Sequence, residues 1–263
     1  MAESYIICTS PRSGSTLLSE MLACAGDAGG PIEFLNRGYR DGHTDWTTYL
    51  ELVRRSCSSD NGVFGGKAHW YQLDEYICDW ANIDSGDLFD ALCSSLGVHR
   101  FIWLRRADVL RQAISLYRAM ISSTWWLPTP STLSRPRPLP YKPAVALRQV
   151  VDAFHCGPAR EVEYPFDFEA ISHIARVLEE QDLRWSEFFR DRAILPIELE
   201  YEALVSFPAA TIGKLRRQLD LPEKRAEDDL TPPLHRQADG MTDELVHRFI
   251  SERRRRTQAT SGT

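Results

Sequence analysis

The feature that most constrains the fold is the change, near the start of the chain, from an apolar run to a small-residue loop and then to a helical pattern. Residues 5–8 (Tyr-Ile-Ile-Cys) favour a strand, and they are followed by the turn-forming cluster of residues 9–13. Apolar side chains then recur at helical spacing over residues 17–22. This order predicts a strand, a loop and a helix packed as one unit.

Two further segments repeat the alternation of strand and helix. Residues 99–104 form a second apolar run, after which Asp108 is placed to begin a helix with apolar positions over residues 109–116. A third strand-like run, residues 193–199, follows a long amphipathic stretch over residues 168–190. Strands that alternate with helices predict an α/β fold with a central, mostly parallel sheet flanked by helices.

Length and composition favour one domain. The 263 residues lie near the upper size of a single core, and we predict a domain over residues 1–252 followed by a basic tail, residues 253–263. Residues 63–64, before a Gly-Gly-Lys run, can supply a further strand end. Residues 124–143 contain six prolines, which no helix or central strand tolerates, so we expect a surface loop there. This loop is either a lid over the acceptor or a passive insertion.

Charge and cysteine content exclude several classes. A formal net charge of -6 gives no reason to expect nucleic acid or an anionic membrane as a partner. The six cysteines form no C-x-x-C pair and are expected to be reduced packing residues. No signal peptide and no apolar stretch of the roughly 18 residues needed for a transmembrane segment is evident, so we expect a cytoplasmic protein.

The first loop has the composition of an anion site. Where a loop joins a buried strand to a helix, backbone N–H groups and the positive end of the helix dipole meet at one point. Gly14 lets an anion approach the backbone closely, and Arg12 adds a forked cation. An ordinary capped helix is the alternative, but the arginine within the loop favours an anion. The predicted anion-binding residues are Arg12, Ser13, Gly14, Ser15 and Thr16.

The known rival for such a loop is the nucleoside triphosphate-binding pattern G-x-x-x-x-G-K-[ST]. Its lysine reaches the terminal phosphates and its hydroxyl holds Mg²⁺. This chain lacks both the first glycine of the pattern and a lysine beside Ser15. A donor that does not need Mg²⁺ fits better, and a phosphosulfate, which carries fewer charges than a triphosphate, is such a donor.

The string Ser-Pro-Arg-Ser-Gly-Ser-Thr-Leu-Leu resembles the phosphosulfate-binding loop of the bacterial trehalose 2-sulfotransferase family. Four further strings resemble segments of that family in the same order: GPIEFL at 30–35, GVFGGK at 62–67, RADVLRQAISLY at 106–117 and RQAD at 236–239. The resemblance covers about residues 4–250. It implies a P-loop-like sulfotransferase fold and transfer of a sulfuryl group from 3′-phosphoadenosine 5′-phosphosulfate (PAPS) to a hydroxyl of a carbohydrate or glycolipid acceptor.

The resemblance also implies roles for individual residues. Glu33 is expected to be the general base, and Arg106 with Ser115 is expected to bind the 3′-phosphate of the donor. Arg12 and the loop N–H groups would stabilise the leaving-group charge, with no metal ion. Two alternatives stay open: Ser115 is an ordinary helix hydroxyl, and the adjacent Arg105 rather than Arg106 contacts the donor.

Residues for the acceptor are less well defined. Lys67 can approach either substrate, Trp126 offers an aromatic face of the kind that binds sugars, and Arg236 and Gln237 can close over the nucleotide or line the acceptor pocket. Residues 124–143 are longer and richer in proline than the family pattern, so the acceptor need not be trehalose. The resemblance implies a homodimer. A Mg²⁺-dependent small-molecule kinase and a non-catalytic nucleotide-binding protein are the competing functions.

Overall fold

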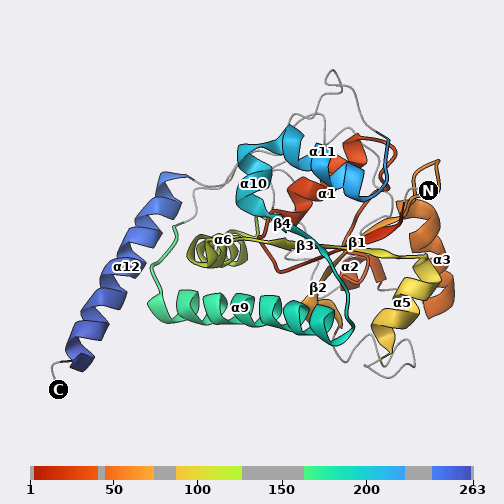
Figure 1. Ribbon diagram of the computed structural model, residues 1–263. Coiled ribbons are helices and arrows are strands. Elements are labelled where there is room, and N and C mark those ends of the chain that lie inside the picture. The colour runs from red at the N-terminus through yellow and green to blue at the C-terminus, as the bar shows by residue number, and fades with distance from the viewer. Residues whose placement is uncertain (1–2, 41–44, 74–86, 126–162, 223–238, 262–263) are drawn as a thin grey trace.

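The computed structural model has a four-stranded parallel sheet at its centre (Figure 1). Residues 3–40, 45–73, 87–125, 163–222 and 239–261 are described. The strands are β1 (Tyr5–Thr9), β2 (Gly65–His69), β3 (Arg100–Arg105) and β4 (Ile197–Glu200). Their order is β2-β1-β3-β4, and every neighbouring pair is parallel. The predicted α/β class with a parallel sheet is confirmed.

Three helices of the described part of the chain cover one face of the sheet. They are α1 (Ser15–Cys24), α10 (Tyr201–Ser206) and α11 (Pro208–Gln218), which lie together above the sheet in Figure 1. Ile7 of β1 is fully buried in one cluster with Leu215 of α11. Because successive side chains of a strand point to opposite faces, the neighbouring residues of β1 face the other layer.

The opposite face packs against an aromatic-rich layer. Its main helices are α3 (Trp46–Cys57), α5 (Leu88–Leu96) and α9 (Phe168–Asp191). Trp185 of α9 is fully buried and packs edge-on against Phe188, with ring centroids 5.7 Å apart. Both rings belong to the same core cluster as the β1 residues on this side, so α9 closes the underside of the sheet.

A third cluster joins α9 to two helices at the edge of the molecule. Ile114 of α6 (Val109–Ser122) and Phe249 of α12 (Gly240–Ser261) are buried within it. Helix α12 runs beyond residue 252, so the boundary expected there between domain and tail falls inside a helix.

None of the helices described is long and apolar enough to cross a membrane. Two short elements are α2 (Arg37–Arg40) and the 3₁₀ turn η1 (Trp70–Leu73).

The second strand lies later in the chain than residues 63–64, where a strand end was expected. It contains the Gly-Gly-Lys run itself, while Phe64 forms an isolated antiparallel bridge with Ser58. The glycines are needed because the sheet is closely packed here. A Cβ at Gly65 would lie 2.8 Å from the Tyr5 hydroxyl oxygen, and one at Gly66 would lie 2.8 Å from a ring carbon of Phe34.

The fourth strand also starts later than the run of residues 193–199 predicts. Ala193 has a left-handed φ of 52°, and its N–H bonds to the carbonyl oxygen of Arg190 at the end of α9. The chain turns there before pairing begins at Ile197. Of the proline-rich segment 124–143, only residues 124 and 125 are described.

Candidate donor site

The predicted anion loop lies between the carboxyl end of β1 and the first turn of α1. Arg12 and Gly14 both have left-handed backbone conformations, with φ of 63° and 88°. A left-handed arginine is uncommon, and such conformations cluster at functional loops. The Ser13 hydroxyl lies 2.5 Å from the hydroxyl of Thr9, which ties the loop to the end of the strand.

Two helices hold the loop from beneath. The side-chain amide of Gln112, buried in α6, donates to the Ser10 hydroxyl at 2.9 Å and to the Pro11 carbonyl at 2.7 Å. The indole N–H of Trp185 in α9 donates to the Thr9 carbonyl at 3.0 Å. These bonds between distant parts of the chain preorganise the loop before any ligand binds.

The structure brings three of the predicted donor residues together. Arg12 Nε donates to the Ser115 hydroxyl at 3.0 Å, and Arg106 Nη1 donates to the Arg12 carbonyl at 3.3 Å. Arg12 Nη1 also contacts the carbonyl oxygen of Trp125. Ser115 therefore meets the Arg12 side chain rather than Arg106, and Arg106 reaches the backbone of Arg12 in the loop.

The arginines of this cluster suit an anion. Burial and, to a smaller extent, the nearby charge of Arg106 together lower the pKa of Arg12 to about 10. Burial also lowers the pKa of Arg106. Cations that are withdrawn from water and repel each other gain most from a bound anion, because it offsets both costs.

The two adjacent arginines at the end of β3 point to different environments. Arg105 Nη2 pairs with Glu198 of β4 at 2.7 Å, and its guanidinium lies 4.2 Å from the centre of the Trp103 ring. Arg106 instead faces the loop. Of the two arginines, Arg106 is therefore the one that contacts the predicted anion loop.

Glu33 lies in a dense polar cluster. Its Oε1 is 3.0 Å from Lys67 Nζ and 3.2 Å from His69 Nε2. Its Oε2 accepts from the amides of Gln72 at 3.2 Å and Asn36 at 3.5 Å. The Glu33 side chain is 25% exposed, whereas Lys67 and His69 are each 5% exposed. The carboxylate is therefore the most exposed of the three groups, and the Lys67 and His69 side chains lie deeper.

Opposing effects set the ionisation of Glu33. Burial alone would raise its pKa, but the Lys67 and His69 side chains outweigh burial and hold the pKa well below the usual value. Because the folded-state pKa lies below the unfolded one, the cluster stabilises the fold above the unfolded pKa. That stability is lost as the pH falls through the folded-state value.

Lys67 connects this cluster to the anion loop. Its Nζ also donates to Thr16 Oγ1 at 3.4 Å, so one ammonium group lies between the Glu33 carboxylate and the first turn of α1. His69 joins the same cluster because residues two apart on a strand share a face, and it lies two residues after Lys67 on β2. Tyr71, which is 48% exposed, stacks on the His69 ring with centroids 5.6 Å apart.

Three predicted residues, Trp126, Arg236 and Gln237, lie outside the described part of the chain. The last residue of the Arg-Gln-Ala-Asp string is described: the Asp239 carboxylate accepts from Arg118 at 2.6 and 2.9 Å. Arg118 lies one turn along α6 from Ser115. This pair attaches the start of α12 to the helix that carries part of the candidate site.

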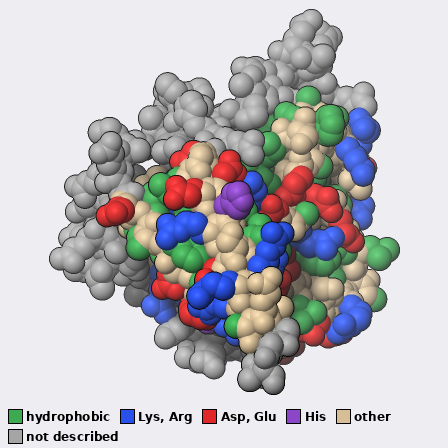
Figure 2. Space-filling view, turned by 90° about the vertical axis from the view of Figure 1, so that its left-hand side faces the viewer, with side chains coloured by type: hydrophobic (Ala, Val, Ile, Leu, Met, Phe, Trp, Pro, Cys, Tyr) green, Lys and Arg blue, Asp and Glu red, His purple; other side chains and the backbone are tan. Residues whose placement is uncertain are grey.

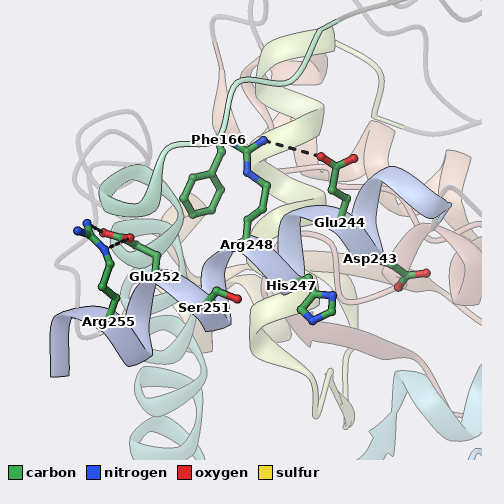
Figure 3. Close-up of a pocket in the computed structure, with 8 residues that line it drawn as sticks. All are labelled: Phe166, Asp243, Glu244, His247, Arg248, Ser251, Glu252 and Arg255. Carbon is green, nitrogen blue, oxygen red and sulfur yellow. Dashed lines mark hydrogen bonds and ion pairs between the residues drawn. The ribbon is translucent and has the colours of Figure 1, made fainter. Parts of the chain in front are cut away.

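A hollow of about 760 Å³ lies along α12, away from the loop. Figure 3 shows that α12 and Phe166 line it, with Arg248 directed toward Glu244, 3.9 Å away, and Arg255 bonded to Glu252. The described residues that line it include none of the predicted site residues.

On the face seen in Figure 2, acidic and basic side chains are interspersed rather than gathered by sign. Among the described residues, no group of three or more His, Cys, Asp or Glu side chains could hold a metal ion.

Comparison with known proteins identifies the family of the chain. The family model described as Stf0 sulphotransferase matches residues 4–252, so the chain belongs to this family and is a sulfotransferase. The trehalose 2-sulfotransferase of Mycobacterium tuberculosis is 28% identical over 94% of this chain and 94% of its own length. That of Mycolicibacterium smegmatis is 28% identical over 95% of this chain and 96% of its own length. The sequence-based assignment to a sulfotransferase family is confirmed.

Proposed function

We propose that the protein transfers a sulfuryl group from PAPS to a hydroxyl of a carbohydrate. The observation that carries the proposal is that Arg106 and Ser115 both contact Arg12 of the anion loop. It provides two cations and a hydroxyl for the anionic groups of one nucleotide, beside the loop N–H groups. The relatives are named for trehalose, and a trehalose-like disaccharide is the acceptor to test first.

The proposed reaction is an in-line displacement at sulfur. The acceptor oxygen forms a new bond to sulfur while the bond from sulfur to the bridging phosphate oxygen breaks. The acceptor proton passes to Glu33, and the electron pair stays with the 5′-phosphate of the product, 3′-phosphoadenosine 5′-phosphate (PAP). Arg12 and the N–H groups of residues 13–16 stabilise the charge that develops on this phosphate.

The position of Lys67 suggests how Glu33 can act as a base. Four donors surround the carboxylate, of which Asn36 is the most distant at 3.5 Å. An acceptor hydroxyl must replace one of them. Since Lys67 Nζ already lies near Thr16, a sulfate on the loop would attract the ammonium and reduce its hold on Glu33. Tyr71 presents a ring beside this cluster that suits a sugar.

Ligand-dependent stability tests the nature of the donor. PAP at about 100 times its Kd should stabilise the fold by about 2.7 kcal/mol and raise the Tm by several degrees. ATP with Mg²⁺ should give a smaller shift at the same concentration, because the loop lacks the lysine and glycine of a triphosphate site. A larger shift with ATP and Mg²⁺ would instead support a kinase.

The homodimer and the cytoplasmic location stay predictions.

Replacing Lys67 with methionine should move the acid limb of the pH profile of kcat/KM to higher pH. The lysine charge is the largest effect that lowers the Glu33 pKa, and without it the effect of burial gains weight. Lys67→Arg, which keeps a cation, should leave the limb near its original position. An acid limb that is the same in the methionine variant and the unmodified protein would mean that Glu33 does not control it.

A further inference from the structure

Arg106 is carried by a short turn rather than by a regular element. Strand β3 ends at Arg105 and helix α6 begins at Val109, so only residues 106–108 join them. The Nε of Arg106 is buried and has no hydrogen-bond partner among the described atoms, and the Nη1 of Arg106 reaches the Arg12 carbonyl at 3.3 Å. A long side chain in such a turn needs further contacts to keep one orientation, because ordering it costs conformational entropy.

Tyr201 supplies one of these contacts. The Arg106 guanidinium carbon lies 4.5 Å from the centre of the Tyr201 ring, which is within the range of a cation–π interaction. The same ring lies against the anion loop, since a Cβ at Gly14 would be 2.9 Å from its Cε2. One aromatic side chain therefore contacts both the loop and Arg106.

Glu202 fixes the backbone of the same turn. Its Oε2 accepts from the N–H of Ala107 at 3.1 Å, and its Oε1 accepts from the N–H of Asp108 at 3.3 Å. A carboxylate with both oxygens bonded to consecutive N–H groups restricts the turn directly after Arg106. Tyr201 and Glu202 are the first two residues of α10, which follows β4 without a loop.

We propose that Tyr201 and Glu202 are positioning residues that hold Arg106 beside the loop, ready for the 3′-phosphate of the donor. The inference rests on the proposed function, because it takes PAPS as the donor. It adds that donor selectivity depends on the packing of α10 against the turn after β3. The ring of Tyr201 orients the side chain of Arg106, and the carboxylate of Glu202 fixes the backbone of the turn that follows Arg106.

Binding of PAP and of adenosine 5′-phosphate, which lacks the 3′-phosphate, tests the inference by titration calorimetry. Tyr201→Leu should weaken PAP binding about tenfold and change adenosine 5′-phosphate binding by less than about twofold, as expected for loss of a partly buried cation–π contact. Tyr201→Phe keeps the ring and should bind both ligands like the unmodified protein. If the leucine variant weakens both ligands equally, or neither, the positioning role is wrong.

A double-mutant cycle shows whether Tyr201 acts through Arg106. In an Arg106→Ala background, Tyr201→Leu should weaken PAP binding by less than a further twofold, because the group it positions is gone. A further tenfold loss would overturn the inference.

For the backbone contact, Glu202→Gln should weaken PAP binding several-fold, since an amide cannot accept both N–H bonds at full strength. The matched control is Glu198→Gln, which changes the partner of Arg105 and should have no such effect. Equal effects of the two changes would contradict a specific role for Glu202.

The failure of this inference differs from a failure of the proposed function. If the unmodified protein does not prefer PAP to adenosine 5′-phosphate, the proposed donor is wrong. If it does prefer PAP and Tyr201→Leu keeps the full preference, only the positioning role is wrong.

Discussion

Replacing Glu33 with glutamine is expected to lower kcat by about 10²–10⁴-fold, the range by which general bases accelerate reactions. Glutamine keeps the size of the side chain and one acceptor oxygen but cannot take the proton of the acceptor hydroxyl. The affinity for PAP should change much less, because a base acts in the transition state rather than in the bound donor. Turnover with labelled PAPS and calorimetry with PAP measure the two quantities.

The control for this substitution is the same change at an exposed carboxylate, Glu198→Gln, which should keep its kcat. The polar cluster around Glu33 indicates which result would contradict its role as a base. Since Glu33 is the counter-ion of Lys67, the neutral glutamine removes the charge that offsets this buried ammonium group. A fall in PAP affinity or in Tm with unchanged kcat would show that Glu33 is needed only for structure.

The anion loop could be predicted because its signals are local. An apolar strand, a small-residue loop and a helical repeat follow one another within residues 5–22, and each depends on neighbours in the sequence. The structure places the loop at the end of β1, as expected. Arg12, Arg106 and Ser115 come together for a less local reason: β1 and β3 are adjacent, parallel strands, so their carboxyl ends meet at one edge.

The residues that sequence reasoning missed belong to contacts between distant segments. Glu202 bonds to the N–H of Ala107, 95 residues away, and the contact depends on β4 pairing with β3. Gln112 lies within a string that resembled the family, yet its bonds to the loop follow only from the packing of α6. Neither tyrosine nor glutamate at a helix start is unusual, so no local pattern singled out Tyr201 or Glu202.

The start of β2 shows how packing can override a local preference. Glycine disfavours strands, and the strand end was expected at residues 63–64, before Gly65 and Gly66. In the structure these glycines lie inside the sheet because Tyr5 and Phe34 leave no room for a side chain. As a result Lys67 is a residue of β2 and lies between Glu33 and the loop.

Alanine substitutions at the two adjacent arginines should separate their roles. Arg106→Ala should weaken PAP binding by about 30-fold or more, because truncating one partner of a buried, hydrogen-bonded charge pair costs about 2–5 kcal/mol. Arg105→Ala removes a partly exposed ion pair with Glu198 and should change the affinity by less than about threefold. Binding of adenosine 5′-phosphate should be similar in both variants.

These two residues form a matched pair, since they are neighbours of the same type at the end of one strand. Comparing the ratio of PAP affinity to adenosine 5′-phosphate affinity in the two variants therefore shows which of the two side chains faces the 3′-phosphate. Arg106 faces the Arg12 carbonyl and the Tyr201 ring, whereas Arg105 faces Glu198 and Trp103. If Arg105→Ala abolished the preference for PAP and Arg106→Ala kept it, the 3′-phosphate would have to bind on the Arg105 side, beside β4.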